Sequence, residues 1–441
     1  MKYMNTIYSI IIMANALAIF SSRNLGNNLI SFTEDDIIST IISDNETEFM
    51  NAVAILNKKG GIIYIDTPVI SLKKNNIVRI NWDFPGGIIG IKQENGEYPR
   101  LDFTYKYLKK DFSGVEINDS NKLLKNIIIE HTPYDGVMIF GDNNTLDHVI
   151  SRYNYGAGFA IYGNFNKLNY CYSYRNCDFD LASYSSSADG FKIEGDNNIF
   201  TYCFSWDNSN SGFNYKRTSN SSELSYLHSG SWNNGNLNVF TGKYDYEDGK
   251  PLDKKLWTIK QFIESDPNFE SNYYNKKYNI DNAHIEGHSA EYWESKVQSK
   301  IKLEGNGFIL GYSNRYEGID VKRNILYCIS FGNKDGGFVD IYNHHRYNAY
   351  MANCASFNNN INYRLPFTFS KWSDNWSWRS SNNDIFNNNE ITTKKPSNTN
   401  SAERLIYSVR DQIIKSVFAD MFPNDSVNFD TLINSLNNKI N

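Results

Sequence analysis

The side chains best suited to do chemistry lie close together in the middle of the chain. Asp189 stands in the stretch Ser187-Ala188-Asp189-Gly190-Phe191-Lys192, and a second polar stretch follows one repeat later. That second stretch carries the amide and hydroxyl oxygens of Asn210, Ser211 and Asn214. A hard cation accepts carboxylate, amide and hydroxyl oxygens, and carboxylates bind it best. What these oxygens can do depends on the elements that position them.

Those elements form an internal repeat. Segments in which a small or apolar residue precedes Ser, usually an aromatic residue, and then Asn occur at 149–154, 171–176, 203–208, 229–234, 328–333 and 354–358. Gly-Phe pairs such as Gly190-Phe191 and Gly212-Phe213 recur in phase with them. The pattern predicts an all-β parallel solenoid whose equivalent residues stack about 4.8 Å apart. A β-sandwich of short strands is the alternative, but it does not explain the common phase.

The segments outside the repeat predict the rest of the organisation. Residues 23–60 are expected to form an N-terminal cap, with a helix in which Phe49, Val53, Ala54 and Leu56 face one side. The solenoid is expected over 61–380, with an insertion at about 242–302. A polar linker (381–400) and a C-terminal helical region (401–441) follow, because a solenoid needs caps at its open edges.

Composition limits the function classes. The 441 residues carry a net charge of −5, which gives no electrostatic support for a nucleic-acid partner. Residues 1–22 combine Lys2, an apolar run and small residues, which predicts a cleaved signal peptide and a secreted, extracellular protein. A membrane anchor is the alternative, but the run is short for a span. After signal cleavage we expect a monomer without membrane contact.

The cysteines follow the same repeat. Four of the five, Cys171, Cys203, Cys328 and Cys354, occupy equivalent repeat positions, and Cys177 does not. Without a CxxC pair they do not predict a zinc site. We expect them to stack inside the fold, although a disulfide between neighbouring repeats has feasible geometry.

The stretch from about Leu124 to Leu365 resembles polysaccharide lyase family 9, the pectate lyases with a right-handed parallel β-helix. The motifs that carry the resemblance are Ala188-Asp189-Gly190-Phe191, Asn208 to Asn214, and Gly305-Asn306-Gly307-Phe308-Ile309-Leu310-Gly311. The resemblance implies calcium-assisted β-elimination in a uronic-acid polysaccharide such as polygalacturonate. In such a reaction the cation neutralises the sugar carboxylate while a base removes the proton on C5.

The resemblance also implies positions for the site. Asp189 matches the first calcium ligand, and the next three ligand positions fall on Asn210, Ser211 and Asn214, which predicts a weak calcium site or none. The position of the family's lysine base falls on Ile309, which cannot accept a proton. The substitute bases are Lys192, Lys302 and Lys334.

Cationic residues near these motifs could hold an anionic sugar, and the candidates are Lys216, Arg217 and Arg346. Three hypotheses remain open from the sequence. The protein is a lyase with a rearranged site, a pseudo-lyase that binds an acidic glycan without cleaving it, or a structural surface solenoid. Fold alone does not choose among them.

Overall fold

The computed structural model describes part of the chain. The described residues are 36–72, 77–80, 85–103, 113–154, 156–176, 188–216, 221–235, 305–311, 320–340, 347–352, 354–365, 371–373, 375–378, 381–382 and 384–386. The predicted signal (1–22), the predicted insertion (about 242–302) and the C-terminal helical region (401–441) lie outside these residues. So do Cys177, Arg217, Lys302 and Arg346. Within the described part, no helix has the length and apolarity to cross a membrane.

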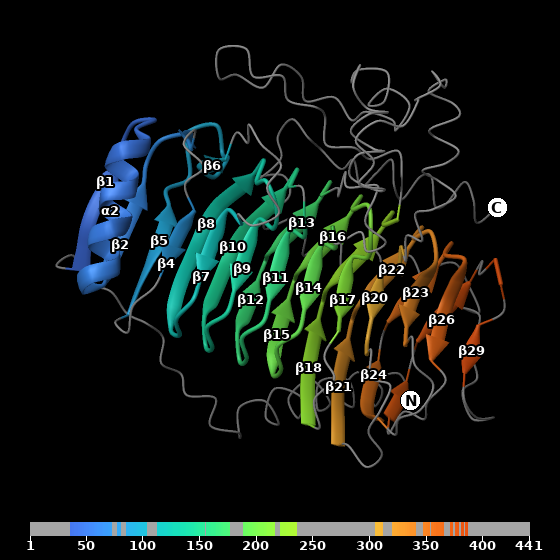
Figure 1. Ribbon diagram of the computed structural model, residues 1–441. Helices are drawn as coiled ribbons and strands as arrows, with labels where there is room; N and C mark the ends of the chain where they lie inside the picture. The colour runs from blue at the N-terminus through green and yellow to red at the C-terminus, as the bar shows by residue number, and fades with distance from the viewer. Residues whose placement is uncertain are drawn as a thin grey trace, which may run out of the picture. The chain divides into compact units, whose positions relative to one another are not determined.

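The N-terminal helix predicted from the sequence is confirmed as α2, Glu46–Lys59 (Figure 1). Asn45 caps it by accepting a hydrogen bond from the Glu48 backbone N–H, and acidic residues occupy its first turn. Its buried residues are Phe49, Ala52, Val53 and Leu56. Ala54, predicted to face the core, is exposed instead, so the buried face is rotated by part of a turn.

Every strand pairing in the described part of the chain is parallel, in two sheets of nineteen and ten strands. The larger sheet contains β1 (Ile37–Ile41), β2 (Gly61–Ile65), β3 (Val69–Ser71), β5 (Gly86–Gly90), β6 (Arg100–Asp102), β8 (Lys122–Glu130), β10 (Thr145–Arg152), β12 (Lys167–Asn169), β13 (Tyr172–Tyr174), β15 (Asn198–Thr201), β16 (Phe204–Trp206), β18 (Ser221–Leu227), β19 (Gly230–Trp232), β21 (Asp320–Leu326), β22 (Ile329–Phe331), β24 (Tyr347–Ala352), β25 (Ala355–Phe357), β27 (Lys371–Ser373) and β28 (Trp376–Trp378).

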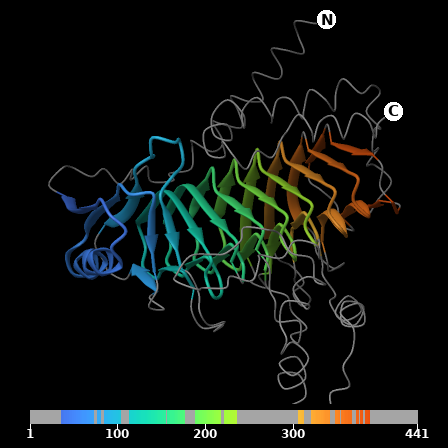
Figure 2. The same cartoon turned by 90° about the horizontal axis from the view of Figure 1, so that it is seen from above.

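The ten-stranded sheet contains β4 (Val78–Ile80), β7 (Val115–Ile117), β9 (Val137–Ile139), β11 (Phe159–Ile161), β14 (Phe191–Ile193), β17 (Phe213–Tyr215), β20 (Phe308–Ile309), β23 (Gly336–Val339), β26 (Ile361–Leu365) and β29 (Ile385–Phe386). The chain passes repeatedly from one sheet to the other (Figures 1 and 2). A circuit such as β15, β16 and β17 adds two strands to the larger sheet and one to the ten-stranded sheet, each beside its equivalent in the previous circuit. This is a parallel β-helix, and each circuit is one rung.

The strand ladder extends beyond the predicted boundaries at both ends. β1 lies in the segment predicted as cap, yet it pairs directly with β2, which follows α2 in the sequence. β29 lies in the segment predicted as linker, and it pairs with β26. Both strands are short, and periodicity over so few residues carries little signal.

The repeat pattern of the sequence corresponds to the rungs. The Ser positions pair in register through Ser151, Ser173, Ser205, Ser231, Ser330 and Ser356. The Phe residues of the Gly-Phe pairs stack inside the β-helix, with ring centroids 4.6–4.8 Å apart from Phe159 to Phe338. Cys171, Cys203, Cys328 and Cys354 are buried free thiols. They stack inside the fold, as expected, and form no disulfide with one another.

The Asn positions form a hydrogen-bonded ladder at one corner of the rungs. Asn208 Oδ1 accepts hydrogen bonds from the backbone N (3.2 Å) and Nδ2 (2.9 Å) of Asn176, one rung earlier. Asn208 Nδ2 donates in turn to Asn234 Oδ1 at 3.0 Å. The residue before each of these Asn residues has a positive φ, for example 54° at Arg175 and 53° at Asp207, which turns the chain sharply at the corner. Each buried amide is thereby satisfied by its neighbours in the stack.

Candidate functional site

Asp189 occupies a recurring position in the rungs, immediately before the Gly that precedes a strand of the ten-stranded sheet. In four of the described rungs, the side chain at this position accepts a hydrogen bond from a backbone N–H of the following rung. The bonds are Ala157 N to Asp135 Oδ1 (2.7 Å), Ser211 N to Asp189 Oδ1 (3.1 Å), Asn306 N to Ser211 Oγ (3.2 Å) and Gly336 N to Asn306 Oδ1 (2.9 Å). Asp189 and Ser211 therefore each link two rungs, a role that needs no metal.

The residues at the four predicted ligand positions lie together around the buried Asp189 carboxylate. Asn210 Nδ2 donates to Asp189 Oδ1 at 2.8 Å, and Asn214 Nδ2 donates to Asp189 Oδ2 at 3.0 Å. The Lys216 ammonium lies 4.0 Å from Asp189 Oδ2, with Lys216 29% exposed and Asp189 fully buried. Asn214 Oδ1, also buried, has no hydrogen-bond partner.

This cluster does not fit a calcium ion. Calcium takes 6–8 oxygen ligands and depends on several carboxylates for its affinity. Here the one carboxylate, Asp189, already accepts three N–H groups and faces an ammonium, and the Ser211 hydroxyl accepts the Asn306 N–H. The positive charge beside Asp189 is supplied by Lys216. The predicted calcium site of Asp189, Asn210, Ser211 and Asn214 is thus a hydrogen-bonded cluster that balances its own charge.

Of the positions predicted for a base, the structure describes Ile309, Lys192 and Lys334, and Lys302 lies outside the described residues. Ile309 is fully buried and pairs in register with Asn214 and Val339. Lys192, which pairs with Asn214 on the other side, donates to the Tyr162 hydroxyl at 3.0 Å and lies 3.3 Å from Glu194 Oε1. Burial alone would lower the pKa of Lys192, but its hydrogen bond to Tyr162 and the nearby carboxylates raise that pKa above its ordinary value.

A raised pKa keeps Lys192 protonated, and an ammonium cannot take a proton from C5 of a sugar. The contacts of the Lys192 side chain with Tyr162 and Glu194 stabilise its charged form, and its role as a substitute base stays a prediction. Lys334, the other described candidate, is an exposed residue whose backbone N–H bonds to the Asn234 carbonyl at 3.0 Å.

The residues that immediately follow four consecutive strands of the ten-stranded sheet form a row across the rungs. They are Phe140, Tyr162, Glu194 and Lys216, whose backbone N–H groups bond to the carbonyls of Ile117, Ile139, Ile161 and Ile193, respectively. We call them the outer row. Ile139, Ile161 and Ile193 are buried in the core, so the alternation of a strand places the residues on either side of them on the outward face. Lys192 and Lys216 therefore belong to one face.

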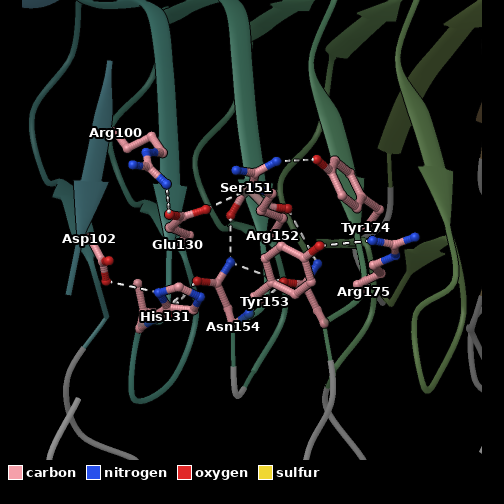
Figure 3. Close-up of polar contacts among 12 residues, drawn as sticks. Arg100, Asp102, Glu130, His131, Ser151, Arg152, Tyr153, Asn154, Tyr174 and Arg175 are labelled. Carbon is pink, nitrogen blue, oxygen red and sulfur yellow. Dashed lines mark hydrogen bonds and ion pairs between the residues drawn. The ribbon is translucent and has the colours of Figure 1, made fainter. Parts of the chain in front are cut away.

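A second polar cluster, which was not predicted from the sequence, lies on the larger sheet (Figure 3). Glu130 Oε2 accepts from Arg152 Nε at 2.7 Å, and Glu130 Oε1 lies 3.3 Å from Arg100 Nη1. Arg152 Nη1 donates to the Tyr174 hydroxyl at 2.7 Å. Burial alone would raise the pKa of Glu130, but Arg152, His131 and Arg100 lower it to about 2.

The same cluster holds a carboxylate and a histidine side by side. Asp102 Oδ1 is 2.8 Å from His131 Nδ1, and both side chains are buried. One ligand atom each of Asp102, Glu130 and His131 fall within 4.8 Å of one another, a spacing that a metal ion could bridge. However, the Glu130 oxygens contact two arginines, and Asp102 contacts His131 Nδ1. The arrangement fits a charge-balanced ion-pair network better than a metal centre.

One signal in the sequence could have revealed this network. Glu130 and Arg152 are 22 residues apart, which is also the spacing of Asn154 and Asn176 in the Asn ladder. Once that rung length is known, opposite charges 22 residues apart become candidates for an ion pair between neighbouring strands.

The ladder of parallel strands and corner amides defines this chain as a parallel β-helix protein. Residues 33–250 match the family model described as "Pel9A-like, right handed beta helix region", so this stretch is a Pel9A-like right-handed β-helix. The resemblance inferred from the sequence and the predicted right-handed fold are confirmed.

Among solved structures, the crystal structure of pectate lyase Pel9A has a TM-score of 0.52 at 19% identity, covering 82% of this chain and 81% of that chain. A rhamnogalacturonan lyase has a TM-score of 0.43 at 13% identity, covering 81% of this chain and 88% of that one. No curated protein matches the chain. At this identity the match to Pel9A shows the fold alone.

Proposed function

We propose that this protein binds an acidic, uronic-acid-containing polysaccharide such as polygalacturonate, without calcium and without cleaving it. The observation that carries the proposal is the Asp189 cluster, in which Asn210, Asn214 and Lys216 satisfy the carboxylate that would otherwise attract a cation. The β-helix of a pectate lyase remains, while the metal chemistry is replaced.

Two partly exposed ammonium groups on the same face support binding of an anion. The side chains of Lys192 and Lys216 are 17% and 29% exposed, on neighbouring rungs about 4.8 Å apart. Each has a carboxylate beside it that fixes its position. A sugar carboxylate would gain charge-assisted hydrogen bonds from ammonium groups that are already ordered.

The same geometry argues against β-elimination. That reaction needs a cation to stabilise the developing charge and a neutral base to accept the proton. Ile309 offers no base, and the contacts of Lys192 favour its protonated form. Secretion, supported by the predicted signal at 1–22, would place the protein where such polymers occur. We propose that it acts there as a monomer.

Two measurements on the full chain test this proposal. Polygalacturonate is incubated with the protein in calcium or in EDTA while the ultraviolet absorbance of unsaturated products is followed, and we expect no increase in either. Calorimetric titration of oligogalacturonate should show binding that EDTA does not change and that salt weakens. Calcium-dependent absorbance would contradict the proposal.

Variants at the two lysines locate the binding. Lys192→Met and Lys216→Met should each weaken oligogalacturonate binding several-fold. The matched control Lys334→Met should leave binding unchanged, because Lys334 follows the corner residue Asn333 and belongs neither to the outer row nor to a strand of the ten-stranded sheet. Absence of any binding by the wild-type protein would favour the structural-solenoid hypothesis instead.

A further inference from the structure

Phe140 is an exposed aromatic residue on the same face as Lys192 and Lys216. It is 48% exposed, although large hydrophobic side chains of the rungs are mostly buried. As the first member of the outer row, it lies three rungs before Lys216, or about 14 Å along the β-helix at the usual spacing of parallel strands.

The next member of the outer row fixes the Phe140 ring. The rings of Phe140 and Tyr162 are stacked, with centroids 5.0 Å apart and planes 10° from parallel. Tyr162 is in turn held by Lys192, whose Nζ donates to its hydroxyl at 3.0 Å and lies 5.2 Å from its ring centroid. Phe140 therefore presents an exposed aromatic surface that is already packed against Tyr162, which lowers the entropy cost of binding a ligand.

We propose that Phe140, supported by Tyr162, is a sugar-binding subsite for the apolar face of a pyranose ring in the acidic polysaccharide. Sites for such ligands combine an apolar or aromatic surface with a few placed polar groups, and the outer row presents both. Phe140 and Tyr162 lie at one end of the outer row and Lys216 lies at the other. On the rung between them, Lys192 lies beside Glu194, the remaining member of the row.

The residues of the outer row and the neighbouring Lys192 fit an acidic polysaccharide better than other ligand classes. A purely apolar partner would not use the partly exposed ammonium groups of Lys192 and Lys216, which already lie beside Glu194 and Asp189, respectively. A small anion would not use Phe140. A polymer that alternates ring surfaces and carboxylates complements both. The inference rests on the proposed function and adds a contact that depends on the sugar ring rather than on its charge.

Phe165 provides a matched control. It is also an exposed phenylalanine, at 46%, but it stands at a corner position with a φ of 58°, outside the outer row. Asn121, Asn143 and Asn197 hold the equivalent corner in other rungs with similar φ values. Because Asn tolerates this conformation better than Phe, Phe165→Asn removes an exposed ring without straining the backbone.

The test measures calorimetric binding of oligogalacturonate and of its fully methyl-esterified, uncharged counterpart to the full chain. Phe140→Ala should weaken binding of both ligands about tenfold, which corresponds to about 1.4 kcal/mol. Phe140→Tyr should restore binding, and Phe165→Asn should match the wild type. Thermal unfolding of each variant confirms that the fold is kept, and Phe140→Tyr shows whether an aromatic ring is what matters.

The outcomes separate the two proposals. If Lys216→Met weakens oligogalacturonate binding while Phe140→Ala leaves both ligands unaffected, the subsite is refuted and the proposed function stands. If Phe165→Asn weakens binding as much as Phe140→Ala, the effect is not specific to the outer row and the subsite is also refuted. If the wild-type protein binds neither ligand, the proposed function itself fails.

Discussion

Replacement of Glu130 by Gln tests the charge balance of the buried network on the larger sheet. The substitution keeps the shape of the side chain but removes the charge that Arg152 and Arg100 contact. The pKa of Glu130 is lowered from 4.5 to about 2 in the folded protein. At 1.36 kcal/mol for each pKa unit, that difference corresponds to about 3 kcal/mol of stability at neutral pH.

The sign of the pH dependence follows from the direction of the shift. A carboxyl whose pKa is lower in the folded state stabilises the protein above its unfolded pKa, here 4.5. That contribution is lost as the pH falls through the folded value of about 2. The wild-type protein should therefore lose stability on acidification in a way that Glu130→Gln does not.

Guanidinium unfolding followed by tryptophan fluorescence between pH 3 and pH 7 measures both effects. The free energy of unfolding of Glu130→Gln should lie about 3 kcal/mol below the wild type at pH 7, and the gap should narrow toward pH 3. A variant with wild-type stability at pH 7, or with the same acid dependence as the wild type, would refute the charge-balance argument.

A matched control separates the buried network from ordinary surface pairs. Glu116 accepts a hydrogen bond from Arg79 Nε at 2.9 Å, but the Arg79 side chain is 53% exposed. Glu116→Gln should therefore lower the free energy of unfolding by less than about 1 kcal/mol. The double variant Glu130→Gln with Arg152→Met should lose less free energy of unfolding than the sum of the two single variants. Each single variant leaves one buried charge without its main partner, whereas the double variant removes both charges.

The remaining predictions concern the rungs themselves. Asn208→Ala should lower the free energy of unfolding by at least about 2 kcal/mol, because the buried N–H groups of Asn176 lose their acceptor; chemical denaturation measures this. Gly212→Ala should destabilise more than Gly230→Ala in the same assay. Its added Cβ would lie 1.9 Å from Ser231 Oγ, whereas that of Gly230→Ala would meet side chains at 3.0 Å. In a Cys177→Ser protein, the buried thiols should not react with a disulfide reagent until the protein unfolds, and one fast-reacting thiol in the native protein would contradict the packing.

The rung architecture was predictable because each rung repeats the same physical requirements. In the rungs of the repeat, a Ser is buried, an Asn forms hydrogen bonds to the neighbouring rungs at the corner, and a Phe stacks in the core. The same residue types therefore recur in phase. The two short end strands, β1 and β29, repeat none of these features and were missed. Their assignment depends on pairing with a neighbour that the local sequence does not specify.

The site was harder to predict because rung length varies. Successive Asn ladder positions are separated by 22, 32, 26, 99 and 26 residues from Asn154 to Asn359. Contacts across rungs therefore have no single fixed spacing, and the 22-residue separation of Glu130 and Arg152 identifies them as a pair only once the local rung length is known. The resemblance placed Asn210 and Asn214 beside Asp189 correctly. It could not show that their amides donate to the carboxylate.

The amides of Asn210 and Asn214 explain how such a site can exist without a metal. Two more carboxylates beside the buried Asp189 would repel it strongly unless a cation lay between them. Amide groups at those positions instead donate hydrogen bonds to Asp189, and Lys216 supplies the positive charge. Meanwhile Asp189 Oδ1 still accepts the Ser211 N–H, a structural role that Asp135, Ser211 and Asn306 fill equally well in other rungs. The rung needs only a short hydrogen-bond acceptor at this position, whereas calcium needs several negative charges. The contacts between rungs therefore do not require the ligand set of a metal.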